Sequence, residues 1–251
     1  DRYTEKSVAL LTARAARAFH EMTPIRYTPA EPGRVYRKIA YGPLLDVFFL
    51  DLRSYRGPNG PAMEDAMTDA SRVLGAEQVR WLKRELANSK ATWKVIASDM
   101  PIGLIVWDDF MARAGAEAVA NGDNGPAKGR ELEIADLLRF IKNAGIDNTV
   151  WFTADVHYTA AHYYDPSKAQ FQDFAPFWEF VSGPIHAGTF GPNDLDMTFG
   201  PEVRFVKAPE AGQVNLPPSA GLQFFGLVDI DGRTEQMTVR LMDRDDRELW
   251  K

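Results

Sequence analysis

Apolar and polar positions along the chain follow two periods, one typical of surface helices and one typical of buried strands. Apolar residues at helical spacing predict an amphipathic helix over residues 4–22, which Thr23-Pro24 ends. The same pattern predicts helices over 76–88 and 131–143, with Gly145 fitting the cap of the second of these. The apolar stripes are Val8, Leu11, Ala15, Phe19 and Met22; Val79, Leu82 and Leu86; and Leu132, Ala135, Leu138 and Ile141.

Short apolar runs rich in β-formers lie between the predicted helices. Residues 46–52, 93–97 and 150–153 are too apolar for strands with one solvated face, so we expect them to be buried strands. A further short helix is predicted over 109–120. The order helix, strand, helix, strand, helix, strand predicts an α/β sandwich.

The stretch 163–220 differs in composition, because proline, glycine and aromatic residues crowd together there. Its aromatic content argues against disorder, and we expect a mostly irregular segment that wraps the domain and walls a site. Residues 222–230 and 236–242 flank Asp231-Gly232 and predict an antiparallel hairpin, followed by a short strand over 248–250.

Polar side chains follow each of the three predicted strands. Arg53, Tyr55 and Arg56 follow the first, Ser98 and Asp99 the second, and Asp155 and His157 the third. If these strands are parallel neighbours, their carboxyl ends meet on one rim, where ligand sites of open α/β sheets lie. This convergence predicts a site more strongly than any single motif does.

Composition narrows the function classes. The chain has 251 residues, 45% of them hydrophobic, and its net charge of −6 argues against a general nucleic-acid or anionic-membrane surface. Absence of cysteine excludes disulfides, zinc-thiolate sites and cysteine nucleophiles within this chain. No stretch is long and apolar enough to span a bilayer. Residue 1 is Asp rather than Met, so we expect a processed or trimmed chain or one piece of a larger protein.

Asp155 and His157 are candidate metal ligands. In an extended chain, residues two apart point the same way, and an oxygen with a nitrogen ligand can chelate a hard or borderline metal. Alternatively, Asp155 caps a turn and His157 is an ordinary half-buried histidine. Arg53 and Arg56 either clamp a phosphate or form bridges to carboxylates. Asp99 either orients a ligand histidine or caps the turn before Pro101.

The other histidines are less informative. His186 lies in a glycine-flanked loop and is a candidate proton donor to a leaving alkoxide, with loop packing as the alternative. His162 is either a second-layer partner of the site or a surface residue. No function is assigned to His20.

Four motifs occur in order along the chain: Asp-Leu-Arg-Ser-Tyr-Arg at 51–56, Gly-Ala-Glu-Gln-Val-Arg-Trp-Leu-Lys at 75–83, Ser-Lys-Ala-Thr-Trp-Lys-Val-Ile at 89–96 and Thr-Ala-Asp-Val-His at 153–157. Together they resemble the PhoD-like alkaline phosphatase/phosphodiesterase family. Residues 180–191 and 216–225 fit one large subgroup. The family usually has glycine where this chain has Ala154. This change affects only the space around the backbone.

The resemblance implies a calcineurin-like metallophosphoesterase sandwich of two mixed sheets flanked by helices, of which residues 1–251 form the C-terminal portion. It implies hydrolysis of phosphate mono- or diesters of small molecules, lipids or nucleotides by a metal-activated hydroxide. By the resemblance, Asp155 and His157 would be metal ligands, and with this reaction we predict Arg53, Arg56 and His186 as catalytic residues. The implied metals are iron and calcium, with other divalent metals possible.

The family's other metal-binding motifs lie upstream of this chain, so the resemblance implies a partner: an N-terminal segment of the same protein. A non-catalytic half-domain that folds with or binds a partner is the alternative function. A hydrolase with a single metal on the rim is a third. Without the rest of the sandwich, we expect the apolar faces of 47–49 and 151–152 to lack partners and the chain to associate. Stable nucleic-acid binding is not expected, and the resemblance implies periplasmic or secreted localisation.

Overall fold

The computed structural model describes residues 4–29 and 31–251. Its α-helices are α1 (Val8–Met22), α2 (Ala76–Asn88) and α3 (Glu131–Asn143), and the short 3₁₀ helices are η1 (Pro166–Lys168), η2 (Met197–Phe199) and η3 (Pro218–Ala220). The bounds of α2 and α3 confirm the predictions. α1 begins four residues later than predicted, because the Ser7 side chain accepts a hydrogen bond from the Leu10 amide and caps the helix there.

A seven-stranded mixed sheet forms the centre of the molecule, in the order β1-β2-β3-β6-β8-β7-β9. Neighbours among β2, β3, β6 and β8 are parallel, whereas β1 and β2, β7 and β8, and β7 and β9 are antiparallel. The strands are β1 (Arg37–Tyr41), β2 (Leu45–Phe49), β3 (Trp93–Ala97), β6 (Thr149–Thr153), β7 (Thr159–Tyr164), β8 (Phe177–Val181) and β9 (Pro201–Lys207). The three predicted strands are therefore adjacent and parallel, as the rim hypothesis required.

Two smaller sheets complete the fold. The predicted hairpin and final strand form a three-stranded antiparallel sheet of β10 (Phe224–Ile230), β11 (Met237–Asp243) and β12 (Glu248–Trp250). The helix predicted over 109–120 is wrong: β4 (Trp107–Asp109) and β5 (Ala114–Ala116) form a two-stranded hairpin there. Left-handed backbone at Arg113 (φ 51°) and Gly115 (φ 71°) ends any helical run.

The prediction of a mostly irregular segment over 163–220 is wrong for the strands inside it. β8 lies in the interior of the large sheet and β9 at its edge. β8 escaped sequence analysis because it carries Glu179, a wholly buried acid, within an otherwise apolar run. The rest of this segment does run as loops and short 3₁₀ turns.

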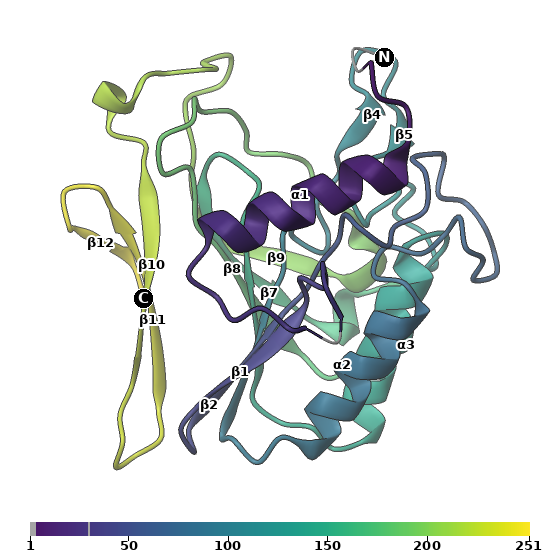
Figure 1. Ribbon diagram of the computed structural model, residues 1–251. Helices are drawn as coiled ribbons and strands as arrows, with labels where there is room; N and C mark the ends of the chain where they lie inside the picture. Colours follow the sequence, from purple (N-terminus) through teal and green to yellow (C-terminus); the bar gives the residue numbers. More distant parts are fainter. Residues whose placement is uncertain (1–3, 30) are drawn as a thin grey trace.

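The molecule has three layers, with α2 and α3 on one face of the large sheet and the β10–β12 sheet on the other (Figure 1). Strand β6 shows how alternation builds both interfaces: Trp151 packs in the core beneath the helices, while Val150 and Phe152 pack toward the small sheet. Phe48 and Trp151 are 0% and 1% exposed, so the expectation that the apolar faces of 47–49 and 151–152 lack partners is wrong for these two residues, whereas Phe49 is 39% exposed.

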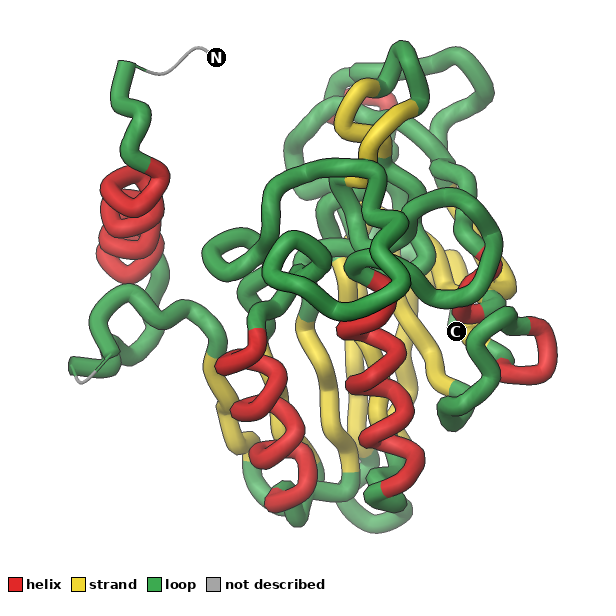
Figure 2. The backbone as a smooth tube through the Cα atoms, turned by 90° about the vertical axis from the view of Figure 1, so that its right-hand side faces the viewer, coloured by secondary structure: helices red, strands yellow, loops and turns green. Residues whose placement is uncertain are grey.

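Helix α1 stands clear of the sheet and of the other helices (Figure 2). Ala16 is its one buried residue in the described chain, while Val8 and Met22 are 74% and 86% exposed. The predicted apolar stripe is therefore largely solvated. Among the described residues, no helix combines the length and apolarity needed to cross a membrane.

Candidate active site

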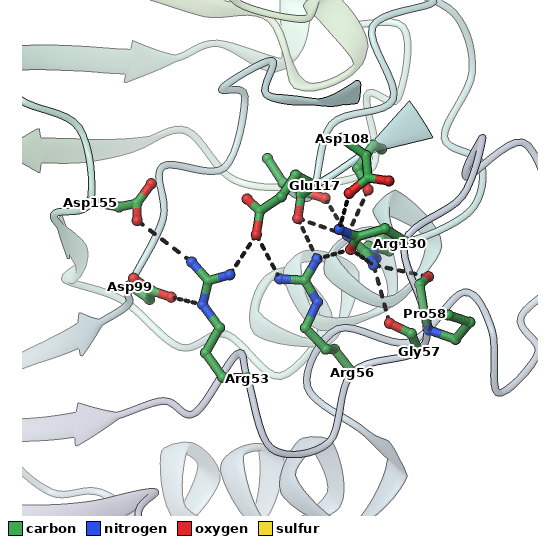
Figure 3. Close-up of polar contacts among 12 residues, drawn as sticks. Arg53, Arg56, Gly57, Pro58, Asp99, Asp108, Glu117, Arg130 and Asp155 are labelled. Carbon is green, nitrogen blue, oxygen red and sulfur yellow. Dashed lines mark hydrogen bonds and ion pairs between the residues drawn. The ribbon is translucent and has the colours of Figure 1, made fainter. Parts of the chain in front are cut away.

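The parallel strands β2, β3 and β6 bring three predicted polar residues together at their carboxyl ends. The Arg53 Nε donates to Asp99 Oδ2 at 2.7 Å, and Arg53 Nη2 lies 3.5 Å from Asp155 Oδ1 (Figure 3). Backbone bonds fix the strand exits, because the Ala154 amide donates to the Asp99 carbonyl at 3.0 Å. The predicted convergence on one rim is confirmed for these residues.

Asp155 sits at the centre of a tight turn rather than in extended chain. Its φ is +65°, and the Val156 amide donates to the Ala154 carbonyl at 2.7 Å. The expectation that extended backbone aligns Asp155 with His157 is therefore wrong. A left-handed aspartate is uncommon, and it aims the carboxylate at Arg53.

The electrostatics of Asp155 follow from its neighbours. Burial raises the pKa of Asp155, and the nearby negative charge of Asp99 raises it further. Arg53 opposes both effects by favouring the carboxylate form. The rim therefore holds carboxylates close together and compensates them with one guanidinium.

His157 is half-buried on the same loop. Its Nδ1 is hydrogen-bonded to the Gly188 carbonyl, and its ring packs 4.4 Å from the Phe190 ring centroid. Because a carbonyl oxygen only accepts, Nδ1 carries a proton, and in the neutral form of this ring Nε2 holds the free lone pair. A carbonyl-bonded Nδ1 is the common arrangement for a histidine that binds metal through Nε2.

Glu117 is the functional candidate that sequence analysis missed. Its Oε1 accepts from Arg53 Nη1 at 2.5 Å and from Arg56 Nη1 at 3.2 Å, and its carbonyl accepts from Arg56 Nη2 at 2.6 Å (Figure 3). Glu117 follows the β4–β5 hairpin, in the stretch wrongly predicted as helix. The sequence signal for the hairpin was Gly115 in that pattern.

The two predicted arginines differ in environment. The Arg53 side chain is 47% exposed, whereas that of Arg56 is 12% exposed and binds Glu117 and Asn59. Burial alone would lower the pKa of Arg53, but the hydrogen bonds and charges of Glu117 and Asp99 together raise it. The interpretation of carboxylate bridges therefore describes both residues, and Arg53 alone retains substantial access to solvent.

Arg130 lies behind this group and is 1% exposed. Its Nη1 donates to the carbonyls of residues 116, 117 and 118 at 3.1, 2.8 and 3.0 Å. Its Nη2 donates to the carbonyls of Gly57 and Pro58 and to the Asn59 side chain at 3.2, 3.1 and 3.0 Å. Burial, with the charge of Arg56, lowers the pKa of Arg130 to about 10. Arg130 thus joins the loop of Arg56 to the loop of Glu117.

The remaining predicted residues lie outside this network. His186 is exposed on the loop that holds His157, and its side chain has no hydrogen bond or ion pair within ranges 4–29 and 31–251. His162 is 2% exposed and bonded to Glu179 Oε2 at 2.9 Å, so its surface alternative is wrong. The Asp99 side chain contacts Arg53, which is neither of the two roles considered for it.

The side chains of Asp155 and His157 are each of a type that binds metal ions. They offer a carboxylate crowded by Asp99 and an imidazole Nε2 with a free lone pair, a donor pair that suits iron or another divalent metal. Across the residues that the structure describes, no group of three or more His, Asp or Glu side chains is placed to hold a metal ion.

Three comparisons place the chain among known proteins. The model of a family described as PhoD-like phosphatase matches residues 1–241. Alkaline phosphatase D of Bacillus subtilis (strain 168) is 29% identical over 197 residues, which cover 74% of this chain and 32% of that protein. A solved structure titled "Structure of PhoD" matches with a TM-score of 0.56 at 20% identity, over 100% of this chain and 51% of that one. The structural match confirms the predicted metallophosphoesterase-type fold, and the chain spans about half or less of these relatives.

Proposed function

Because the chain belongs to the PhoD-like phosphatase family, we propose that it forms the phosphoester-hydrolysing rim of a metal-dependent phosphatase. The observation that carries the proposal is the convergence of Arg53, Asp99 and Asp155 at the carboxyl ends of parallel strands. The proposed substrates are phosphate esters of small molecules, lipids or nucleotides, and both monoesters and diesters are to be tested.

In this proposal, Asp155 and His157 Nε2 hold a metal ion, with iron and calcium as the first candidates. When bound, such an ion supplies Lewis-acid polarisation of the phosphoryl group and lowers the pKa of a water molecule. The fit rests on the crowded carboxylate and on the Nδ1 bond that orients His157. We propose that an N-terminal segment of the same protein supplies the remaining ligands.

Arg53 is the proposed phosphate-binding residue. Its guanidinium reaches the rim beside Asp155, and its side chain is 47% exposed, so a phosphate oxygen can approach its outer N–H groups. Arg56 is too enclosed for this contact. It acts as a positioning residue instead, because its bonds to Glu117 hold the carboxylate that orients Arg53.

His186 is the proposed proton donor to the leaving alkoxide. Its side chain is exposed, and it lies two residues before Gly188, whose carbonyl is hydrogen-bonded to His157. Imidazole is the side chain that most often serves as a general acid in enzymes. A His186→Gln variant with unchanged turnover of a poor leaving group would contradict this assignment.

The experiment compares hydrolysis of p-nitrophenyl phosphate and bis-p-nitrophenyl phosphate by the chain alone and by the chain co-expressed with an N-terminal PhoD-like segment. Asp155→Asn is the test variant, since asparagine tolerates the left-handed backbone at φ +65°. Asp173→Asn is the matched control, because Asp173 pairs with Arg139 and Lys142 away from the rim. Loss of turnover in Asp155→Asn alone supports the proposal, and equal turnover in both variants contradicts it.

The second candidate function is a non-catalytic half-domain that folds with or binds a partner chain. The observation that favours it is that no metal-ligating group of three or more acidic or histidine side chains occurs in the described ranges. Metal content measured by mass spectrometry on the dialysed protein distinguishes the two. A stoichiometric metal that Asp155→Asn removes, together with turnover by the isolated chain, excludes the non-catalytic alternative.

A further inference from the structure

A strongly basic groove lies apart from the rim, between the segment that leads into β1 and helix α2. It encloses about 700 Å³. Five cationic side chains line it with one carboxylate, Glu85, in a protein whose net charge is −6. The cations are Arg26, Arg34, Arg37, Lys38 and Arg84, and we call this the basic groove. None of its lining residues belongs to the rim network of Arg53, Asp99, Glu117 and Asp155.

Three of the five cations have carboxylate partners. Arg34 pairs with Glu31, Lys38 lies 3.1 Å from Asp46, and Arg84 lies 3.1 Å from Glu85. Arg26 is exposed, and its side chain makes no hydrogen bond or ion pair with the residues that the structure describes. Arg37 likewise has no carboxylate partner there. The groove therefore carries about two positive charges that the surrounding protein leaves uncompensated.

Among the described residues, Arg37 is held in the groove by neutral hydrogen-bond acceptors and not by an anion. Its Nε donates to the Val35 carbonyl at 2.9 Å, Nη1 to the Arg26 carbonyl at 2.7 Å, and Nη2 to the Arg34 carbonyl at 3.1 Å. Nη2 also lies 3.1 Å from His20 Nε2. These contacts fix the plane of the guanidinium without neutralising it, and one N–H on Nη1 remains.

His20, the side-chain neighbour of Arg37, does not supply the negative charge that Arg37 lacks. Its Nδ1 lies 2.8 Å from the Ala16 carbonyl, so Nδ1 carries the proton and Nε2 accepts from Arg37 as a neutral imidazole. Burial and the neighbouring Arg34 lower the pKa of Arg37. A guanidinium that is fixed in place beside other cations and has no anionic partner is well suited to bind an anionic ligand.

We propose that the basic groove binds a phosphate group. Guanidinium groups recognise phosphate through charge-assisted hydrogen bonds, and the two uncompensated arginines match the charge of a phosphate monoester or of inorganic phosphate. Ile25 and Ile39 provide apolar wall beside the arginines. The site is independent of the proposed catalysis, since its residues lie outside the rim network.

The test measures binding of inorganic phosphate to the 251-residue chain by isothermal titration calorimetry. Arg26→Gln is the main variant, because Arg26 is exposed and its side chain makes no hydrogen bond or ion pair in the described residues. The expected result is binding that Arg26→Gln weakens about tenfold, as for the loss of one charge-assisted contact. Arg14→Gln is the matched control, an exposed arginine on α1 outside the groove, and should bind as the parent does.

A second pair of measurements separates the groove from the rim and one phosphate source from another. Arg53→Gln should leave groove binding unchanged, and binding that Arg53→Gln abolishes instead would assign the phosphate to the rim and overturn the proposal. Vesicles containing phosphatidic acid replace inorganic phosphate in a parallel titration. Vesicle binding that Arg26→Gln weakens identifies a lipid headgroup as the source, whereas no binding of either probe, or binding indifferent to Arg26, refutes the site.

Discussion

Replacement of Arg130 by methionine should destabilise the protein by about 3 kcal/mol. The four N–H groups of the two terminal nitrogens serve six acceptors, so four charge-assisted hydrogen bonds are lost. At roughly 1.5 kcal/mol each, they contribute about 6 kcal/mol. The lowering of the pKa of Arg130 to about 10 corresponds to a cost of roughly 3 kcal/mol for burying its charge. The methionine variant does not have this cost. Methionine keeps most of the volume, so the cavity term is small.

Urea unfolding followed by tryptophan fluorescence measures this loss, provided that the slope of free energy against urea stays constant. Arg139→Met is the control, on helix α3, which begins directly after Arg130. Its ion pair with Asp173 joins side chains 48% and 45% exposed, so its loss should stay below about 1 kcal/mol. A loss below about 1 kcal/mol for Arg130→Met, or an equal loss for both variants, would refute the hydrogen-bond argument.

Three further predictions concern charge, core and surface. Burial, with the charge of Asp196, raises the pKa of Glu131 to about 8 from 4.5. Between these two pH values, the folded state keeps a proton that the unfolded state releases. The free energy of unfolding therefore falls as pH rises from 4.5 to about 8. Glu131→Gln should flatten that fall in urea titrations at several pH values, and an unchanged slope would contradict the assignment. Leu82→Ala removes a side chain that is 0% exposed and should cost about 3 kcal/mol in the same assay, with a loss below about 1 kcal/mol arguing against a packed α2 interface. Met22→Lys replaces a side chain that is 86% exposed and should change stability by less than about 0.5 kcal/mol; a larger loss would show that Met22 is covered in solution.

Regular periodicity accounts for what could be predicted from the sequence. α2 and α3 have apolar stripes along one side, and their predicted bounds agree with the structure. Strands β3 and β6 are short apolar runs that end in polar residues, and this placed Asp99 and Asp155 on one rim. Adjacent parallel strands also placed Arg53 on this rim, although the contact between Arg53 and Asp99 was not among the roles predicted for Asp99.

The other parts of the fold and of the site depend on contacts between residues far apart in the sequence, which no local sequence pattern predicts. Glu117 reaches Arg53 across 64 positions of sequence, and the loop that carries it follows a hairpin rather than a helix. Glu179 and Arg130 are charged residues that a sequence assigns to the surface, yet both are buried because hydrogen bonds satisfy them. Asp155 adopts a left-handed backbone that its sequence context does not specify.

The strand order β6-β8-β7 has a consequence for how the protein assembles. β6 and β7 are joined by only five residues, 154–158, yet β8 lies between them in the sheet. β8 pairs in parallel with β6 and antiparallel with β7, so both ends of the linker that carries Asp155 and His157 are held by a strand that comes later in the sequence. The geometry of the rim therefore depends on a non-local strand pairing, a kind of contact that forms more slowly than the local contacts of a helix.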